Sequence, residues 1–456
     1  MARGKKKETI LTPEEKLQEA LVPESEWPYK IPENWRWVYG RLCFLPMESK
    51  KPSGDLFKYI DIDSIDNKRQ AVTDPKIIEV VKAPSRASRA LHKGDTIFSM
   101  VRPYLKNIAY IDDSLADSIA STGFYVCSPK ENIDPKYIYY LMVSPYVVDG
   151  LNSYMKGDNS PSIRKDDIEM FQYPLPPLPE QQRIVDRIES LFAKLDEAKE
   201  KAQAVVDGFE GRKAAILHKA FTGELTEEWR ERQGISAEKW KKKEIGKFAF
   251  VTKLAGFEYT KNIAPNLTDR GIPLFKGKNV QKGELVLEFE SYIPKEVSDE
   301  LSRSKLTRKC LLTPYVGTIG NIAIFDGTFE AHLGSNVGKI EINSDIIEEF
   351  LLYYLRSDLG YKELTKEKKA TAQESISIQA IRNVIVPVPM RKEQERIVEI
   401  LDQLIGKEKQ VEEIAVYTIE QIDTMKKSIL ARAFRGELGT NDPSDESAEE
   451  LLKQIL

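Results

Sequence analysis

Apolar residues recur at alternating steps of three and four along two stretches of the chain, and this spacing is typical of helices that pair through one apolar face. The first stretch presents Ile184, Ile188, Leu191, Leu195 and Ile216. The second presents Ile397, Leu401, Leu404, Ile422 and Ile429. Each stretch predicts a helix about 60 Å long, at roughly 1.5 Å per residue. A lone helix would leave this face in water, so the two helices are predicted to pair through these positions.

The two stretches are copies of one segment. The segment 174–225 opens with PLPPLPEQQRIVDRIESLF and ends with KAAILHKAFTGEL. The segment 387–438 opens with PVPMRKEQERIVEILDQLI and ends with KKSILARAFRGEL. Arg183 and Arg396 are 213 positions apart, and the same offset relates the phenylalanines of the two endings. A constant offset across separated blocks indicates an internal duplication.

The regions between the helices predict two copies of a mixed domain. Short apolar runs bounded by turn residues predict strands at 58–62, 95–100, 107–111 and 123–127, and a short helix is expected at 137–143. The sequence Asn-Ile-Ala occurs at 107–109 and again at 321–323, an offset of 214. The scaffold therefore repeats, whereas the connecting segments differ, as expected for modules with different targets.

We predict an α+β chain with a pseudo-twofold internal repeat. Two α/β domains are separated by two long helices, which pair as an antiparallel coiled coil because the first helix carries the chain from one domain to the other and the second returns. The predicted boundaries are 1–26 for a charged N-terminal arm, 27–173 for the first domain, 174–225 for the first helical region, 226–386 for the second domain, 387–438 for the second helical region and 439–456 for an acidic tail, a flexible link ending in a short helix.

Length and composition narrow the class of protein. At 456 residues the chain is too long for a single core, so at least two domains are expected. No apolar run approaches the roughly 20 residues that a membrane span needs, and the basic N-terminus lacks the apolar core of a secretory signal. Cys43, Cys127 and Cys310 are isolated, which argues against a disulfide framework or a zinc site. We expect a cytoplasmic protein without a membrane partner.

The sequence contains no motif that predicts catalysis. The histidines His92, His218 and His332 lack metal-ligand spacing. The segment 271–278 lacks the Ser or Thr that follows Lys in a P-loop. We find no methyltransferase motif of the [DN]PP[YF] type and no nuclease carboxylate cluster. We predict no catalytic residue and no metal ligand in this chain.

Local charge points to anion binding, although the net charge of −4 argues against nucleic acid. The stretches 82–106 and 302–320 are strongly basic and interleave Ser, Thr and Tyr. Arg and Lys bind phosphates, and Arg and small polar groups also contact base edges. The alternative is a solvated basic face. The candidate DNA-binding residues are Lys82, Ser85, Arg86, Ser88, Arg89, Arg102, Tyr104, Lys106, Lys276, Lys278, Arg303, Lys305, Arg308, Tyr315 and Thr318.

Two motifs carry a resemblance to a known family. The phrases PLPPLPEQQRIVDRIESLFAKLDEA and VPVPMRKEQERIVEILDQL, with the two AF-x-GEL endings, resemble the specificity subunit of type I restriction-modification systems. The stretch 85–109 resembles one that is common in the target recognition domains of that family. The resemblance covers nearly the whole chain, but the recognition domains match only as scaffold.

The resemblance implies a DNA-binding subunit without catalysis of its own. Each recognition domain would read one half of a bipartite, asymmetric site in double-stranded DNA. The paired helices would set the gap between the halves and dock two methyltransferase (modification) subunits, and restriction-translocase subunits would join that core. S-adenosylmethionine, ATP and Mg²⁺ would belong to these partners, and this chain would bind no cofactor.

Two other classes of protein stay open as alternatives. A single-chain nuclease or methyltransferase with similar recognition domains should show catalytic motifs. A coiled-coil scaffold would use its globular domains to bind protein. The dependence of DNA binding on salt separates the scaffold from a DNA-binding protein, because phosphate contacts make affinity fall steeply with salt.

Overall fold

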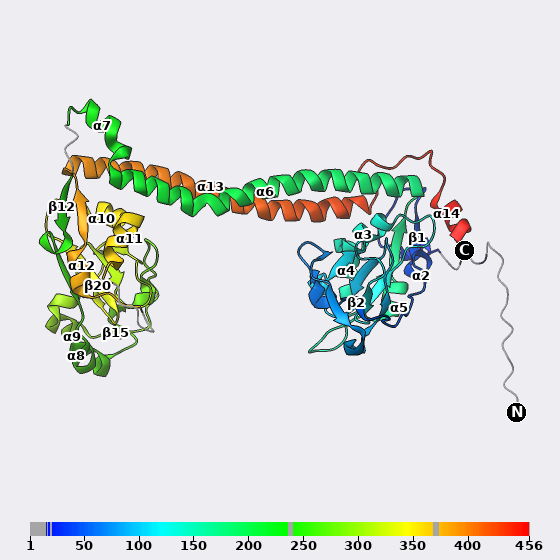
Figure 1. Ribbon diagram of the computed structural model, residues 1–456, viewed down its shortest axis with the longest axis horizontal. Coiled ribbons are helices and arrows are strands. Elements are labelled where there is room, and N and C mark those ends of the chain that lie inside the picture. Colours follow the sequence, from blue (N-terminus) through cyan, green and yellow to red (C-terminus); the bar gives the residue numbers. More distant parts are fainter. Residues whose placement is uncertain (1–14, 16, 19–20, 236–239, 368–373, 456) are drawn as a thin grey trace. The chain divides into compact units, whose positions relative to one another are not determined.

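The computed structural model describes residues 15, 17–18, 21–235, 240–367 and 374–455. The described chain forms two compact units. The first unit takes in the chain as far as Ala202 and again from Tyr417 onward, and the second spans Gln203–Val416. Each unit therefore contains one domain together with one part of each long helix (Figure 1).

The two long helices are α6 (Leu178–Thr222) and α13 (Arg391–Ala433), which confirms the helices predicted from the heptad spacing. Both begin in the same way. The side-chain amides of Gln181 and Gln394 donate to the carbonyl of a preceding proline, at 2.9 and 3.0 Å. Among the described residues, no helix is both long enough and apolar enough to cross a membrane.

Both long helices also end in the same way. A glycine with positive φ follows each helix, with φ of 88° at Gly223 and 74° at Gly436. This left-handed conformation is the usual C-terminal cap of a helix and favours glycine, which has no Cβ. A Cβ on Gly436 would also lie only 2.4 Å from the Cγ of Pro32. The glycine of each AF-x-GEL motif is thus explained by the end of its helix.

Within the first unit the long helices run antiparallel. Lys426 binds Asp196 at 2.5 Å, and Lys199 binds Asp423 at 2.6 Å. Residue numbers therefore rise along α6 as they fall along the facing part of α13. The second unit repeats this arrangement around an ion pair between Arg212 and Glu408. The predicted antiparallel coiled coil is confirmed.

The predicted apolar positions of the two helices differ in burial. Five of them are fully buried, namely Ile184, Ile188 and Ile422 in the first unit and Ile397 and Leu401 in the second. The others are half-buried, namely Leu191, Leu195 and Ile429 in the first unit and Ile216 and Leu404 in the second. The fully buried isoleucines of α6 also pack into the core of the first domain. The apolar face of α6 therefore contributes to the core of the first domain as well as to the contact between the two helices.

The first domain contains a four-stranded sheet of order β5-β2-β9-β6 and a three-stranded sheet of order β10-β7-β8, with shorter pairs β1-β11 and β3-β4. The strands are β1 (Arg36–Tyr39), β2 (Leu56–Ile60), β3 (Ile65–Asp66), β4 (Ala71–Val72), β5 (Lys76–Glu79), β6 (Ala87–Ala90), β7 (Thr96–Ser99), β8 (Ile108–Tyr110), β9 (Ile119–Ser121), β10 (Phe124–Cys127) and β11 (Gln172–Leu175). The helices are α2 (Gly40–Cys43), α3 (Pro135–Val143), α4 (Pro145–Asn152) and α5 (Lys165–Glu169), with short turns η1 (Glu24–Glu26), η2 (Ile62–Ser64), η3 (Val80–Lys82) and η4 (Pro103–Leu105).

The second domain contains four-stranded sheets of order β15-β14-β19-β16 and β13-β20-β17-β18, with a shorter pair β12-β21. The strands are β12 (Lys241–Glu244), β13 (Ala249–Lys253), β14 (Ile272–Phe275), β15 (Tyr292–Ile293), β16 (Lys305–Leu306), β17 (Cys310–Pro314), β18 (Ala323–Phe325), β19 (Ala331–Leu333), β20 (Val337–Ile342) and β21 (Ile385–Val388). The helices are α7 (Glu227–Arg232), α8 (Gly256–Glu258), α9 (Lys295–Glu300), α10 (Glu348–Arg356), α11 (Asp358–Thr365) and α12 (Ile378–Asn383), with short turns η5 (Glu224–Thr226), η6 (Ile245–Lys247), η7 (Tyr259–Ile263), η8 (Ala264–Asn266), η9 (Gly277–Asn279) and η10 (Ser302–Ser304).

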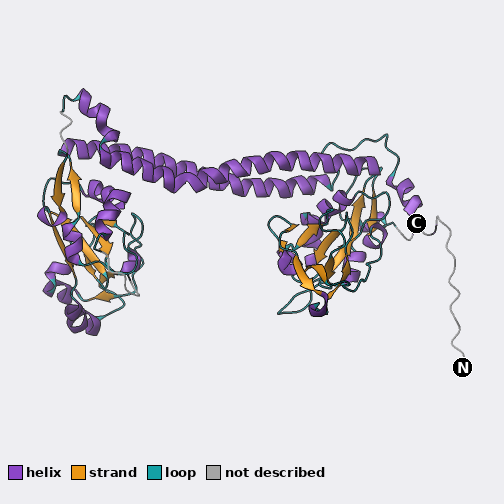
Figure 2. Cartoon of the chain, in the orientation of Figure 1, coloured by secondary structure: helices purple, strands orange, loops and turns teal. Residues whose placement is uncertain are grey.

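The two domains share the strand order of their two main sheets, as the internal repeat predicts, except that β13 adds an edge strand to the second sheet of the second domain. In the first, β2 runs parallel to β9 with Tyr59 opposite Ile119, and in the second, β14 runs parallel to β19 with Leu274 opposite His332. The outer strands of both sheets pair antiparallel. Figure 2 shows that the strands belong to the two domains and that the two long helices contain no strand.

A buried glutamate near the start of each long helix holds its unit together. Glu180 is fully buried and accepts from the indole of Trp35 at 2.7 Å and from the amide of Asn441 at 2.8 Å. Burial raises the pKa of Glu180, and these hydrogen bonds oppose the shift. In the second unit, the equivalent glutamate is Glu393. These are the glutamates of the repeated EQ pair.

The acidic tail is held against the first unit, which differs from the flexible link expected from its composition. Asn441 bonds to Glu180, and Asp445 forms an ion pair with Arg183. The tail ends in α14 (Ala448–Ile455), whose Leu451 and Leu452 are buried in the core of the first domain. Burial of these apolar side chains offsets the acidic character that suggested a free segment.

Candidate functional site

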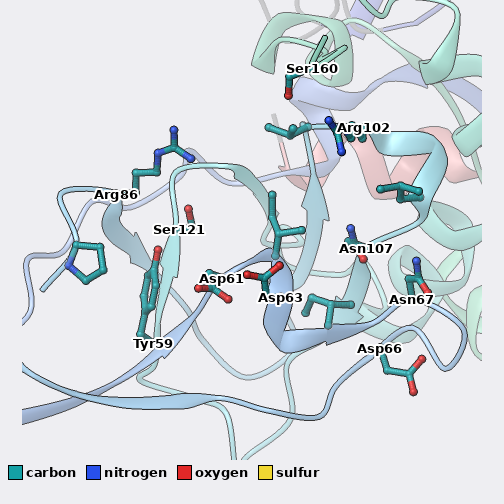
Figure 3. A pocket seen from close by; sticks show the side chains of 15 residues that line it. Tyr59, Asp61, Asp63, Asp66, Asn67, Arg86, Arg102, Asn107, Ser121 and Ser160 are labelled. Atoms are coloured by element: carbon teal, nitrogen blue, oxygen red, sulfur yellow. The ribbon is translucent and has the colours of Figure 1, made fainter. Parts of the chain in front are cut away.

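A cavity of about 840 Å³ opens on the first domain (Figure 3). It lies where β2, the segment before β6 and the β7–β8 connection meet, with the loop at Ser160 completing its wall. Figure 3 shows acidic side chains at its centre and arginines at its edge. Its polar lining residues are Tyr59, Asp61, Asp63, Asp66, Asn67, Arg86, Arg102, Asn107, Ser121 and Ser160.

The acidic side chains are positioned by the end of β2. Directly after the strand, Asp61 and Ser64 cap the turn η2 through hydrogen bonds of 3.1 and 3.3 Å. The other carboxylate oxygen of Asp61 binds Lys76 on the neighbouring strand β5 at 2.6 Å. This hydrogen bond raises the pKa of Lys76. Asp63 lies two residues further on, is exposed, and forms no ion pair with any described residue.

The arginines at the edge come from two different segments. Arg86 is exposed in the segment before β6, and Arg102 lies in the β7–β8 connection. Arg102 and Lys106 flank η4 with φ of 48° and 58°. Such left-handed conformations cost bulky residues about 1–3 kcal/mol and cluster at functional sites. Between them, Tyr104 is 45% exposed.

A second cavity, of about 450 Å³, lies at the corresponding place in the second domain. Lys276 and Lys278 line it directly after β14, and Thr318 and Asn321 line it from the β17–β18 connection. The ammonium of Lys276 donates to the hydroxyl of Ser291 at 2.9 Å. Lys278 forms an ion pair with Glu290, which lowers the pKa of that carboxylate.

The structure brings some of the predicted DNA-binding residues together in these cavities and separates others. Arg86 and Arg102 line the first cavity, and Lys276, Lys278 and Thr318 line the second. The predicted residues outside the two linings are Lys82, Ser85, Ser88, Arg89, Tyr104, Lys106, Arg303, Lys305, Arg308 and Tyr315.

The charges of the basic stretch 302–320 are largely cancelled inside the second domain. Arg303 binds Glu258 at 3.0 Å, Lys305 binds Asp299 and lies 3.5 Å from Glu330, and Arg308 binds Glu341. By contrast, in the described part of the chain no carboxylate forms an ion pair with Arg86, Arg89, Arg102 or Lys106. The first stretch therefore keeps part of the cationic charge that the sequence indicated, whereas its Lys82 and Lys93 pair with Glu79 and Asp113.

Among the described residues we find neither a metal-binding cluster nor a reactive cysteine. No cluster of three or more His, Cys, Asp or Glu side chains there has the geometry to hold a metal ion. The three cysteines are buried, and burial raises the pKa of Cys43 and of Cys310 to about 12. These thiols are therefore protonated at neutral pH, whereas a nucleophilic cysteine acts as the thiolate.

The residues in the centre of the first cavity, namely Asp61, Asp63 and Asn107, were not predicted from the sequence. Asp61 fell inside the strand predicted at 58–62, Asp63 was not singled out, and Asn107 entered only as a marker of the repeated scaffold. The signal that could have found them is their spacing, since Asp61 and Lys276 each follow the last residue of an equivalent strand.

Comparison with known proteins identifies similar chains. A family model for the type I restriction modification DNA specificity domain matches residues 45–206 and 237–416. The chain is 28% identical over 283 residues to the specificity subunit of the type I restriction enzyme EcoBI of Escherichia coli. That match spans only 58% of either chain.

Two solved structures are similar over most of the chain. One, from work on the complex assembly and conformational transition of the type I R-M system, has a TM-score of 0.73 at 26% identity, over 90% of this chain and 100% of that one. The other is the HsdS subunit from Thermoanaerobacter tengcongensis, with a TM-score of 0.66 at 26% identity, over 91% of this chain and 100% of that one.

Proposed function

This chain belongs to the type I restriction-modification DNA specificity family, and on that premise we propose that it selects the DNA sequence on which a type I restriction-modification complex acts. Each domain reads one half of a bipartite, asymmetric site in double-stranded DNA. The observation that carries the proposal is the pair of cavities, which occupy the same place in two domains of one topology but have different polar linings. Two domains whose cavities have different linings are suited to a DNA site whose two halves differ in sequence.

The long helices and the partners belong to the same proposal. The helix pair sets the spacer between the half-sites and docks two methyltransferase subunits, and restriction-translocase subunits join the assembly. S-adenosylmethionine, ATP and Mg²⁺ are bound by those partners. Support comes from the relatives, which are named as specificity subunits of type I restriction enzymes. The chain itself acts by recognition and is not the catalyst.

Exchange of the first domain tests this function. Residues 27–173 are replaced by the equivalent domain of a relative with a known target, and the helical regions 174–225 and 387–438 are kept. The sequences methylated in cells that also carry the methyltransferase subunit are then mapped. We expect the first half-site to change to that of the donor, while the second half-site and the spacer stay the same. A change in both half-sites, or in neither, would contradict the modular organisation.

Replacing Arg86 by alanine should weaken binding to the target by about 1–3 kcal/mol if its guanidinium contacts a base, or reduce the salt dependence by about one counterion if it contacts a phosphate. The reason is that Arg86 is exposed at the edge of the cavity without a carboxylate partner among the described residues. Affinity is measured over a range of salt concentrations. Arg303→Ala is the matched control, because Arg303 is already paired with Glu258. Equal effects of both substitutions would remove Arg86 from the interface.

A further inference from the structure

The two cavities present opposite charges at one structural position. Tyr59 and Leu274 are equivalent, because each is the first residue of the parallel strand pair in its sheet. Two residues later, β2 is followed by Asp61 and β14 by Lys276. The backbone NH of each donates to the side chain of the residue three positions on, at the start of a short turn. Where the first domain has two aspartates, the second has two lysines.

The second member of each pair is Asp63 in the first domain and Lys278 in the second. All four charged residues line their cavities. Asparagines from the repeated Asn-Ile-Ala sequence line both cavities as well. The cavities are therefore the same recess in two copies of one domain, and the exchange of carboxylates for ammonium groups changes which hydrogen-bonding groups each recess accepts.

The residues on the neighbouring strands also differ between the two domains, in keeping with the opposite charges of the cavities. Lys76 lies opposite Tyr59 on β5 and binds Asp61. The equivalent position next to Leu274 is Ser291, whose backbone carbonyl accepts from Leu274 at 3.1 Å and whose hydroxyl accepts from Lys276. Lys76 thus satisfies Asp61 within the domain. Asp63 remains as an acceptor that no described residue occupies through an ion pair.

A second observation concerns the asparagine of the first cavity. Asn107 is only 6% exposed and lines this cavity, yet its side-chain amide has no hydrogen-bond partner among the described residues. Although the residue as a whole is buried, its amide atoms are not among the fully enclosed polar atoms that lack a partner, so the amide reaches the open cavity. The equivalent Asn321 does donate, to the carbonyl of Val280 at 3.1 Å. The open amide of Asn107 is therefore available for a group that enters the cavity.

We propose that the first domain reads its half-site through the exocyclic amino group of adenine or cytosine, with Asp63 accepting from that group and Asn107 bonding a base edge in the same half-site. The second domain reads guanine, whose O6 and N7 accept from the ammonium donors that Lys276 and Lys278 keep besides their contacts with Ser291 and Glu290. In the major groove, carboxylates accept from the N4 amino group of cytosine, asparagine pairs with adenine, and lysine donates to guanine. This inference rests on the proposed function.

The test is selection of binding sequences from a library of randomised DNA duplexes by the full chain. With Asp63→Ala, we expect the preference at one base pair of the first half-site to fall by about 5–150-fold, while the second half-site is unchanged. Lys278→Ala should relax one guanine position in the second half-site alone. Asp63→Lys should shift the affected position of the first half-site towards guanine.

Asp66→Ala is the matched control. Asp66 also lines the first cavity, but its carboxylate is occupied by the backbone NH groups of Lys68 and Arg69, at 2.9 and 3.1 Å. This variant should keep every base preference. If Asp63→Ala instead raises affinity for all duplexes alike, the carboxylate only repels phosphates and the inference is wrong, although the chain still selects a sequence. If the unaltered chain enriches no sequence, the proposed function fails as well.

Discussion

Replacing Glu393 by alanine should lower the free energy of unfolding of the second unit by about 3–5 kcal/mol, the cost of removing one partner from a buried ion pair. The carboxylate is almost fully buried and accepts from the guanidinium of Arg230 at 2.6 Å, the hydroxyl of Thr226 at 2.8 Å and the indole of Trp240 at 3.2 Å. The side chain of Arg230 is only 14% exposed, so its charge would remain buried without a counter-charge.

Hydrogen exchange of core amides such as that of Leu311 measures this loss for the second unit alone. The matched control is Glu395→Ala, two residues along α13. Glu395 is exposed and pairs with Arg391 at 3.2 Å, an interaction of about 0.5 kcal/mol or less. Equal losses of stability in the two variants would show that the buried glutamate does not hold the unit together.

Lengthening both long helices by one heptad should increase the preferred spacer by about three base pairs. Seven residues add roughly 10 Å at 1.5 Å per residue, and DNA rises about 3.4 Å per base pair. The insertions are placed between Gly211 and Arg212 and between Glu408 and Lys409. The ion pair between Arg212 and Glu408, at 2.7 Å, shows that these points face each other. A whole heptad in each helix keeps the apolar seam in phase.

The spacer is read from the sites methylated in cells that carry the variant. Both half-sites should be unchanged, because the domains are untouched. Insertion of the same heptad beside Gly54, where an added Cβ would meet no other atom within 4 Å, controls for added length and should leave the spacer as it was. A folded, active variant that keeps the parental spacer would contradict the role of the helices in measuring it.

Much of the fold could be predicted from local signals. The heptad spacing of residues such as Ile188 and Leu401 predicted the long helices, and the constant offset of 213 positions predicted the repeat. Burial along the seam could not be predicted, because Ile184 packs into the first domain as well as towards α13. The packing of the acidic tail against the first unit could not be predicted either. It depends on two leucines of α14 that are buried in a core formed by residues far away in the sequence.

The site could be predicted less well, because charge was visible in the sequence and pairing was not. The partners of Arg303 and Arg308 are Glu258 and Glu341, 45 and 33 residues away. No local pattern relates such residues, so the stretch 302–320 looked more cationic than it is. Asp63 was missed for the converse reason: an isolated acid in a loop is usually solvated surface, and only the shared sheet register relates it to Lys278.

The division of the chain between the units sets an order for synthesis. Residues of the second unit leave the ribosome as one continuous stretch, whereas the first unit needs the segment from Tyr417 onward. Tyr137 therefore waits for its ring contact with Phe434 while the intervening chain is translated, on the order of 15–60 s at about 5–20 residues per second. The unit encoded second matures first. During that delay, the open core of one nascent chain can accept the C-terminal segment of another, and so neighbouring ribosomes on one message favour exchange of this segment between copies.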